Sequence, residues 1–416
     1  MTATVIDFAE LEKRILHTLA GPELMPEQVI QACDTLSQKL TEAEYLPLLM
    51  AAGIPEAQAR RELAEARQML SRSYLEHRLA IELGELAGQF TPYGLSAAVR
   101  QEYRPLGVLL HIAAGNMDAL PAFSVLEGLL TGNINLLKLP GGGDVLSPMI
   151  LNELAQIEPL IADYALVFDV PSRDTDTLTQ LAALADAVVV WGGDEAVSAV
   201  RTMAAPDTRI IEWGHKLSFA YVSGDAPDEA LRGIAQNMCE TNQTLCSSCQ
   251  GIFVGSADYD DAVRFAERFI QILDQQAKAV PMPTDPFLDA QKTLEMYTEE
   301  LESCKTEKRV FRTENCGVIA YGDCALTPSY MFRHCWARPL PRNKLLAELS
   351  KYKNHLQTAA LVCEETQRAA LESLLLKTGV VRVTSGENMS RAYCGMPHDG
   401  EFALRRYVKI VSCEYE

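Results

Sequence analysis

The sequence predicts an α/β protein built around a doubly wound parallel sheet. From Arg104 onward, short apolar runs that end at glycine or proline alternate with helical stretches. This alternation is typical of parallel sheets that carry helices on both faces. A helical segment precedes the alternating part, and a second α/β domain and a C-terminal strand are expected to follow it.

The first 90 or so residues are expected to be helical. In the stretch after Met25-Pro26, apolar residues recur at helical spacing, and Pro26 suits the first turn of a helix. Between Pro55 and Leu83 no glycine or proline occurs after the first residue. That composition predicts one long helix, with a packing role rather than a chemical one.

The next part of the chain predicts five strands that alternate with helices. The strands are expected at Gly107–Ile112, Asn135–Leu139, Tyr164–Val170, Ala187–Trp191 and Arg209–Glu212. The helices between them are expected at Ala119–Leu130, Leu146–Ala155, Thr175–Leu184 and Asp194–Met203.

A second α/β stretch follows, from about Pro227 to Gln367. Its landmarks are helices at Asp228–Met238 and Asp260–Gln276 and a strand at Gly251–Val254, and the tail Leu404–Val411 alternates like a strand. We expect residues 1–225 to form the helical segment and a first sheet domain, completed by about 390–416. Residues 226–389 are expected to form the second domain.

Composition excludes several classes of function. The chain has 416 residues, and 37 Lys and Arg against 56 Asp and Glu give a net charge of −19. Such acidity argues against binding to nucleic acid or to anionic membranes. No apolar run is long enough to span a bilayer, and Met1–Glu12 is acidic where a secretion signal is basic. With 11 cysteines, an odd number, we expect a cytoplasmic protein with reduced thiols.

Glycines follow two of the predicted strands, at Lys138–Asp144 and at Trp191–Asp194. Glycines there let a phosphate approach the backbone, and the start of a helix offers free N–H groups. Neither junction has the G-x-G-x-x-G pattern of ordinary dinucleotide-binding proteins. Two such junctions in one sheet nevertheless favour a nucleotide site.

One cysteine lies where catalytic groups are common. Cys246 lies in the polar segment Glu240–Gln250, between a predicted helix and a predicted strand. As a thiolate it would be a good nucleophile toward carbonyls and thioesters. The pair Cys246-x-x-Cys249 also suits a redox pair, half of a zinc site, or two small buried residues. Because no second cysteine pair has matching spacing, we predict no metal site.

Several motifs, in order, resemble the aldehyde dehydrogenase superfamily, and more closely its LuxC-type branch of long-chain fatty-acyl reductases. The resemblance runs from about Arg104 to the C-terminus. Its motifs are Pro105–Val108 with Gly115-Asn116, Thr131–Asn133 with Lys138, Gly192-Gly193, Glu212–Lys216, Asn242–Cys246, Cys394–Gly400 and the residues Leu404, Tyr407, Lys409 and Val411.

The resemblance implies an aldehyde dehydrogenase-like fold and a role for each matching residue. Cys246 would be the nucleophile, with Cys249 as a bystander, and Asn116 and the Cys246 backbone N–H would hold the oxyanion. Glu212 would occupy the general-base position. The implied cofactor residues are Lys138, Gly141, Gly192, Gly193 and Gly214.

The implied reaction is the reduction of a fatty acyl thioester to a fatty aldehyde, through an acyl-cysteine. NAD-dependent relatives place an acidic residue after Lys138, where this chain has Gly141. Without that carboxylate a 2′-phosphate meets no like charge, so we expect NADPH to be preferred. The resemblance also implies a homo-oligomer, paired through the last strand, and an acyl-activating partner enzyme.

Other functions fit the residues less well. A short-chain CoA-acylating aldehyde dehydrogenase and a γ-glutamyl-phosphate reductase would share the fold. A cofactor-free acyl carrier would use Cys246 without reduction, and a structural thiol or metal protein would use none of this chemistry.

Overall fold

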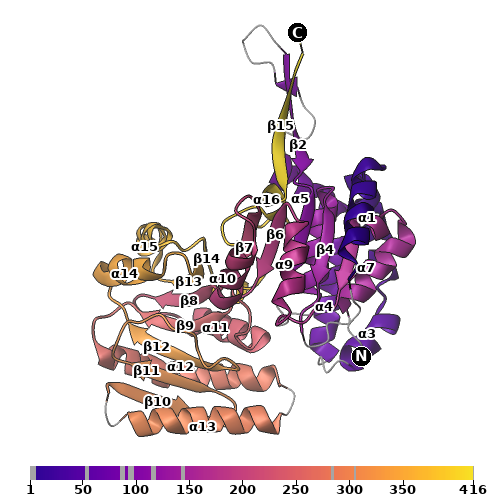
Figure 1. Ribbon diagram of the computed structural model, residues 1–416. Coiled ribbons are helices and arrows are strands. Elements are labelled where there is room, and N and C mark those ends of the chain that lie inside the picture. Colours follow the sequence, from indigo (N-terminus) through magenta and orange to yellow (C-terminus); the bar gives the residue numbers. More distant parts are fainter. Residues whose placement is uncertain are drawn as a thin grey trace. The chain divides into compact units, whose positions relative to one another are not determined.

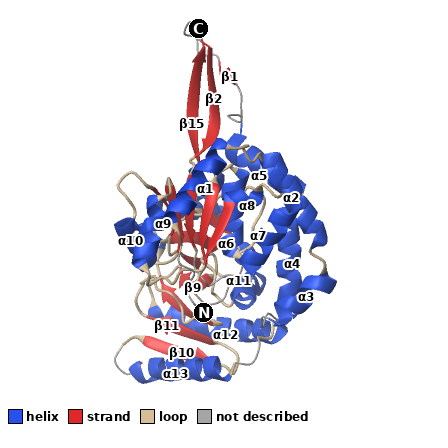
Figure 2. Cartoon of the chain, turned by 45° about the vertical axis from the view of Figure 1, so that its right-hand side comes forward, coloured by secondary structure: helices blue, strands red, loops and turns tan. Residues whose placement is uncertain are grey.

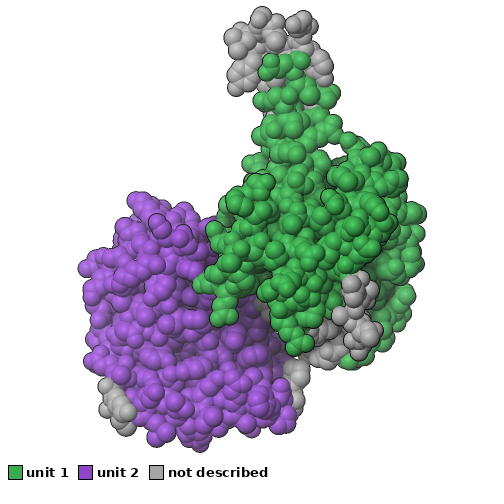
Figure 3. Space-filling model, viewed as in Figure 1, with its two compact units in different colours: residues 1–214, 393–416 green, residues 215–392 purple. Residues whose placement is uncertain are grey.

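The computed structural model describes residues 6–51, 56–84, 90–91, 98–113, 119–141, 146–282, 285–303 and 306–415. The chain forms two compact units (Figure 3). The larger comprises Met1–Gly214 together with Tyr393–Glu416, and the smaller comprises His215–Ala392.

The larger unit is built on a parallel sheet of five strands (Figure 1). The strands are β3 (Val108–Ile112), β4 (Ile134–Lys138), β5 (Ala165–Phe168), β6 (Ala187–Trp191) and β7 (Arg209–Trp213). They lie in the order β5-β4-β3-β6-β7, and every neighbouring pair is parallel. This is the doubly wound arrangement predicted from the sequence, and its order reverses between β3 and β6.

Helices alternate with these strands, as the apolar periodicity predicts. They are α6 (Leu120–Leu130), α7 (Leu146–Ile157), α8 (Ile161–Tyr164), α9 (Thr175–Ala183) and α10 (Asp194–Met203). The C-terminal segment returns to the same unit as the short helix α16 (Ala403–Arg406), and it packs with Tyr407 against Leu109, Val189 and Ile211 of the sheet.

The prediction of one long helix over Pro55–Leu83 is wrong. The five N-terminal helices are α1 (Phe8–Ala20), α2 (Pro26–Lys39), α3 (Glu42–Ala51), α4 (Glu56–Leu70) and α5 (Arg72–Leu83). The backbone is extended at Ser71, and the Arg72 N–H donates to Asp34 of α2. Because the helix breaks here, Leu70 and Leu75 both enter the core. Helix propensity does not reflect this gain in tertiary packing.

A three-stranded antiparallel sheet belongs to the larger unit and projects beyond its helices (Figure 2). It contains β1 (Phe90–Thr91), β2 (Ala98–Pro105) and β15 (Val408–Tyr415), in which Val408 pairs with Pro105. The predicted C-terminal strand therefore begins later than expected. Leu404 lies in α16 and Tyr407 precedes the strand. Both are buried, and Tyr407 packs against the five-stranded sheet rather than joining β2.

The smaller unit contains a seven-stranded sheet in the order β10-β11-β12-β9-β8-β13-β14. Its strands are β8 (Leu217–Val222), β9 (Cys249–Val254), β10 (Lys308–Arg312), β11 (Gly317–Tyr321), β12 (His334–Pro339), β13 (Leu356–Val362) and β14 (Arg382–Thr384). Only β10 runs antiparallel to its neighbour within this sheet.

The helices of the smaller unit complete its core. They are α11 (Asp228–Thr241), α12 (Tyr259–Ala279), α13 (Pro286–Glu302), α14 (Arg342–Leu349) and α15 (Glu365–Thr378), with short 3₁₀ turns η2 (Ser350–Tyr352) and η3 (Gly386–Asn388). In the part of the chain that the structure describes, no helix is both long and apolar enough to cross a membrane.

A fully buried histidine links three elements of the larger unit. His111 on β3 is 2.8 Å through Nδ1 from the Ser124 hydroxyl and 3.0 Å through Nε2 from Asn135 Oδ1. The Trp191 indole N–H also donates to Ser124. Burial lowers the pKa of His111 to about 4, so the ring is neutral at pH 7.

We expect His111 to make the larger unit sensitive to mild acid. The native state binds this proton less tightly than the unfolded chain, whose histidine pKa is about 6.5. The stability that the neutral His111 ring contributes is therefore fully present above about pH 6.5 and is lost as pH falls toward 4.

Denaturant unfolding at pH 7 and pH 5 measures how the free energy of unfolding depends on pH. Between these pH values the wild type should lose about 2 kcal/mol more of its free energy of unfolding than the variant His111→Gln. Equal pH slopes for the two proteins would contradict the assignment.

Candidate active site

The residues predicted to hold a cofactor lie along one edge of the five-stranded sheet. Lys138 is the last residue of β4, and Gly192 follows the last residue of β6. Glu212 is the penultimate residue of β7, and Gly214 follows that strand directly. Because the strands are parallel, their carboxyl ends meet at this edge, where ligands of doubly wound sheets bind.

Lys138 is a buried cation at this edge. Its side chain is almost fully buried, and Nζ donates to the Ser172 hydroxyl at 2.7 Å. Burial lowers the pKa of Lys138, while the negative charge of Asp169 opposes that shift. The lysine thus offers a positive charge with little surrounding water, which suits an anionic group of a ligand.

The glycines differ in the space around them. A Cβ at Gly141, Gly193 or Gly214 would meet no atom of the described residues within 4 Å, whereas one at Gly192 would come 3.0 Å from the Ala196 Cβ. Gly193 is the N-cap of α10, but Asp194 and Glu195 fill the first turn of that helix. Their negative charges disfavour a phosphate at this helix start, so Lys138 is the better phosphate contact.

Glu212 forms an ion pair within its own unit. Its Oε2 lies 2.7 Å from Arg201 Nη2 on α10, and the carboxylate side chain remains 38% exposed. The predicted Asn116 lies outside the described residues. Glu212 belongs to the larger unit and Cys246 to the smaller.

The motif Cys394–Gly400 contributes an aromatic contact that sequence reasoning did not identify. The His398 ring lies 5.1 Å from Trp191 and 4.8 Å from Trp213, measured between ring centroids. These tryptophans end β6 and β7, so His398 lies at the same carboxyl edge as the glycines.

Cys246 lies in the smaller unit, on the loop between α11 and β9. The loop starts where Asn242 and Gln243 adopt left-handed backbone conformations with φ of 46° and 61°. Among the described cysteines Cys246 is the only exposed one, and none of those described forms a disulfide. An exposed thiol at the end of a rigid sheet has the access that a nucleophile needs.

Two residues that the sequence analysis did not single out bind Cys246 directly. The Gln357 side-chain amide donates to the Cys246 Sγ at 3.2 Å, and the Ser218 hydroxyl donates to the Cys246 carbonyl at 2.7 Å. Gln357 is a polar residue in the otherwise largely apolar strand β13, which is the one signal that could have pointed to it.

Cys249 is chemically very different from Cys246. It is the first residue of β9, and it is fully buried with its sulfur 3.3 Å from the Gly251 carbonyl. Burial raises the pKa of Cys249 to about 12, so its thiol stays protonated and unreactive near neutral pH. Nowhere among the described residues do three His, Cys, Asp or Glu side chains gather as a metal site.

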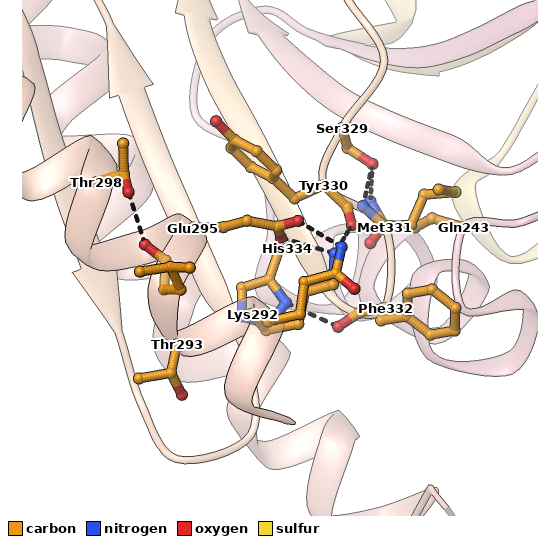
Figure 4. Close-up of polar contacts among 12 residues, drawn as sticks. Gln243, Lys292, Thr293, Glu295, Thr298, Ser329, Tyr330, Met331, Phe332 and His334 are labelled. Carbon is orange, nitrogen blue, oxygen red and sulfur yellow. Dashed lines mark hydrogen bonds and ion pairs between the residues drawn. The ribbon is translucent and has the colours of Figure 1, made fainter. Parts of the chain in front are cut away.

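The base of the Cys246 loop is held by two buried glutamines and a serine, of which Figure 4 shows Gln243 and Ser329. Gln243 Nε2 donates to the Cys249 carbonyl and to the Ser329 hydroxyl. Ser329 in turn donates through both its N–H and its hydroxyl to Gln250 Oε1, at 3.1 and 2.8 Å. Gln250 Nε2 closes the ring by donating to the Gln243 carbonyl at 2.9 Å.

The segment that carries Ser329 is itself strained and firmly held. Met331, Phe332 and Arg333 have consecutive positive φ values of 59°, 48° and 69°, and the Phe332 N–H donates to the Asn242 carbonyl. Figure 4 shows Lys292 of α13 directed at this segment, where its ammonium donates to the Tyr330 carbonyl and pairs with Glu295. Such strain persists only where surrounding contacts fix the backbone.

A family model described as acyl-CoA reductase (LuxC) matches residues 23–410. A long-chain acyl-protein thioester reductase of Vibrio harveyi is 24% identical over 320 residues, covering 74% of this chain and 65% of that protein. One from Aliivibrio fischeri is 23% identical over 324 residues, covering 75% and 64%. The chain thus spans under two thirds of the length of these relatives.

Solved structures of aldehyde dehydrogenases share the fold at low sequence identity. Betaine aldehyde dehydrogenase of Staphylococcus aureus matches with a TM-score of 0.73 and 14% identity, covering 98% of this chain and 88% of that one. Aldehyde dehydrogenase 21 of Physcomitrella patens matches with a TM-score of 0.73 and 13% identity, covering 99% and 91%. These matches confirm the predicted aldehyde dehydrogenase-like fold.

The glutamine and serine ring predicts a specific stability loss. Ser329→Ala should lower the free energy of unfolding by about 1–3 kcal/mol, because it deprives two buried amide groups of a partner. Thr298→Ala, at an exposed position of α13, removes only a hydroxyl that bonds to its own helix. It should change the free energy of unfolding by less than about 0.5 kcal/mol. Equal losses in denaturant unfolding would show that the ring does not hold the loop.

Proposed function

This chain belongs to the acyl-CoA reductase (LuxC) family, and on that premise we propose that it reduces a fatty acyl thioester to a fatty aldehyde with NADPH. The observation that carries the proposal is Cys246. Its thiol is exposed, hydrogen bonds hold the base of its loop, and a side-chain amide donates to its sulfur.

Cys246 is the proposed nucleophile. Its thiolate forms a C–S bond with the acyl carbon, and the donor thiolate leaves, which produces an acyl-cysteine. The Cys246 backbone N–H and the Asn116 amide are the proposed donors to the oxyanion. NADPH, when bound, supplies the hydride for the reduction. The Cys246–acyl C–S bond then breaks, the electron pair returns to sulfur, and the aldehyde is released.

Glu212 is proposed to assist proton transfers rather than to activate water. Its ion pair with Arg201 supports this role, because the arginine already occupies one oxygen of the carboxylate. A reductive enzyme gains from such restraint, since hydrolysis of the acyl-cysteine would consume the intermediate without producing aldehyde.

We assign cofactor binding to the larger unit and nucleophilic chemistry to the smaller one. Residues 1–225 with about 390–416 would hold NADPH, and residues 226–389 would carry Cys246. In the larger unit, Lys138 supplies positive charge, and the open space at Gly141, Gly193 and Gly214 lets a ligand approach the backbone closely. The uncharged residue Gly141 favours NADPH over NADH.

The acyl donor is proposed to be a protein-bound or CoA-bound long-chain thioester. The relatives are reductases of long-chain acyl-protein thioesters by name, which supports an acyl-activating partner enzyme as the source. We further propose a homo-oligomer that pairs through β15, an edge strand of its three-stranded sheet.

We expect Cys246→Ala to lower aldehyde production by a factor on the order of 10³ or more, because it removes the nucleophile. Cys249→Ala should keep the activity within a few-fold, since its buried thiol takes no part. The assay follows NADPH oxidation and aldehyde with acyl-CoA substrates of increasing chain length. Activity of Cys246→Ala near the wild-type level would reject the mechanism, and a preference for two- to four-carbon acyl groups would reject the fatty substrate.

Gly141→Glu should weaken NADPH binding by about tenfold and leave NADH binding little changed. The added carboxylate has room and would repel the 2′-phosphate. Gly141→Gln is the matched control, because it adds the same bulk without charge and should leave the preference for NADPH. Fluorescence titration of each cofactor measures the dissociation constants. Wild-type affinities that are equal, or higher for NADH, would contradict the cofactor assignment.

A further inference from the structure

We propose that Gln357 is a catalytic residue whose side-chain amide stabilises the Cys246 thiolate, both when it attacks the acyl group and when it leaves the aldehyde. The role rests on the proposed function of Cys246 as nucleophile. It goes beyond that function by assigning to a residue 111 positions away the task of tuning the sulfur.

The first support is the contact itself. Gln357 Nε2 lies 3.2 Å from Cys246 Sγ and donates to it, and the Gln357 side chain is 93% buried, with 7% exposed. A donor aimed at sulfur favours the charged form of the thiol, because an anion accepts a hydrogen bond more strongly than a neutral sulfur does. No proton needs to be transferred, since the amide only redistributes stability between thiol and thiolate.

The second support is a local distortion of the sheet at this place. Between the pairs Leu356–Leu217 and Ala359–Phe219, strand β13 has two residues, Gln357 and Thr358, opposite the single residue Ser218 of β8. On its other side, β8 also has a register shift against β9, between Ser218 and Ala220. Bulges of this kind are concentrated next to active sites, where they redirect a side chain.

Both residues of the bulge, Gln357 and Thr358, help to hold Cys246. The Thr358 N–H donates to the Ser218 hydroxyl at 3.0 Å, and that hydroxyl donates to the Cys246 carbonyl. Gln357 reaches the sulfur of the same cysteine. Residues at one distorted point of β13 therefore fix both the carbonyl and the side chain of Cys246. A residue with a purely structural role would not need this distortion of the strand.

Charged groups lie only at the margins of the elements that surround the sulfur. The loop 242–248 and strands β8 and β13 contain no charged residue, and Tyr221 of β8 is buried with its pKa raised to about 12. The titratable groups at their ends are Glu240, Cys249, Lys216, His355, Cys363 and Glu364. Ser247 is bonded to Ser390, and the charged residues flanking that serine are Glu387 and Arg391. Within these described elements, the Gln357 amide is a polar group that the structure aims at the sulfur.

The test measures the rate at which iodoacetamide alkylates Cys246, by peptide mass spectrometry, as a function of pH. Gln357→Met keeps the length of the side chain and removes the donor, and it should slow alkylation at pH 7 about three- to tenfold. Gln357→Glu replaces the donor with a carboxylate and should slow it further. Both variants should reach nearly the wild-type rate at high pH, where the Cys246 thiol is ionised in all three proteins.

Gln291→Met, the same substitution at an exposed site of α13, is the control and should leave the whole profile unchanged. Thermal unfolding of each variant checks folding, and Gln357→Met alone carries the test if Gln357→Glu does not fold. A pH midpoint of alkylation that does not move in Gln357→Met would overturn the proposal. So would a rate that falls equally at every pH, because that pattern indicates lost access instead of lost thiolate.

The same samples keep this inference apart from the proposed function. Wild-type protein is mixed with acyl-CoA, and the peptide that contains Cys246 is examined for an acyl group. An acylated wild type with an unmoved alkylation profile in Gln357→Met contradicts the role of Gln357 only. An unacylated wild type contradicts the proposed function and, with it, the catalytic role of Gln357, whatever the alkylation profile shows.

Discussion

The hydrogen bonds that fix the loop around Cys246 are the constraint on which this account depends. A free thiol on a surface loop has no defined direction, and ordering the backbone of each loop residue costs about 1–2 kcal/mol. Here the carbonyl of Cys246 is held by Ser218, its sulfur by Gln357, and the start of its loop by Gln243. A hydrogen bond between Phe332 and Asn242 joins two segments with strained backbones, and this bond fixes the loop on the sheet.

The larger unit provides a second fixed frame, of a different kind. Its five parallel strands end at one edge, and Lys138 and the open glycines lie along it. The buried group His111-Ser124-Asn135-Trp191 connects β3, α6, β4 and β6 behind this edge. The chemistry of each unit is thus supported by buried polar contacts that hold the backbone in place.

The sequence predicted much of the fold because the fold depends on local patterns. Apolar runs that end at glycine or proline located the five parallel strands, and the helix Asp194–Met203 begins and ends where its pattern does. Ordered motifs identified the family and the fold. The break at Ser71 was missed because it arises from contacts with α2. The start of β15 was misplaced because Leu404 lies in the helix α16 and Tyr407 is buried against a sheet distant in sequence.

The site was predictable to a smaller extent, for a physical reason. The position of Cys246 in a polar loop is a local property, whereas the contacts that prepare it come from residues far away along the chain. Gln357 lies 111 positions from Cys246 and Ser218 lies 28 away, and the bulge that unites them exists only once three strands are paired. The partner of Glu212, Arg201, likewise comes from the neighbouring helix α10.

The central claim is that Cys246 carries the acyl group between its donor and NADPH. The most direct measurement mixes the wild-type chain with a long-chain acyl-CoA in the absence of NADPH, maps the acylated peptide by mass spectrometry, and then adds NADPH. The account predicts one acyl group on Cys246 that persists until NADPH is added and then leaves as an equal amount of aldehyde. Aldehyde formed while Cys246 remains unmodified, or an acyl group located on another residue, would contradict it.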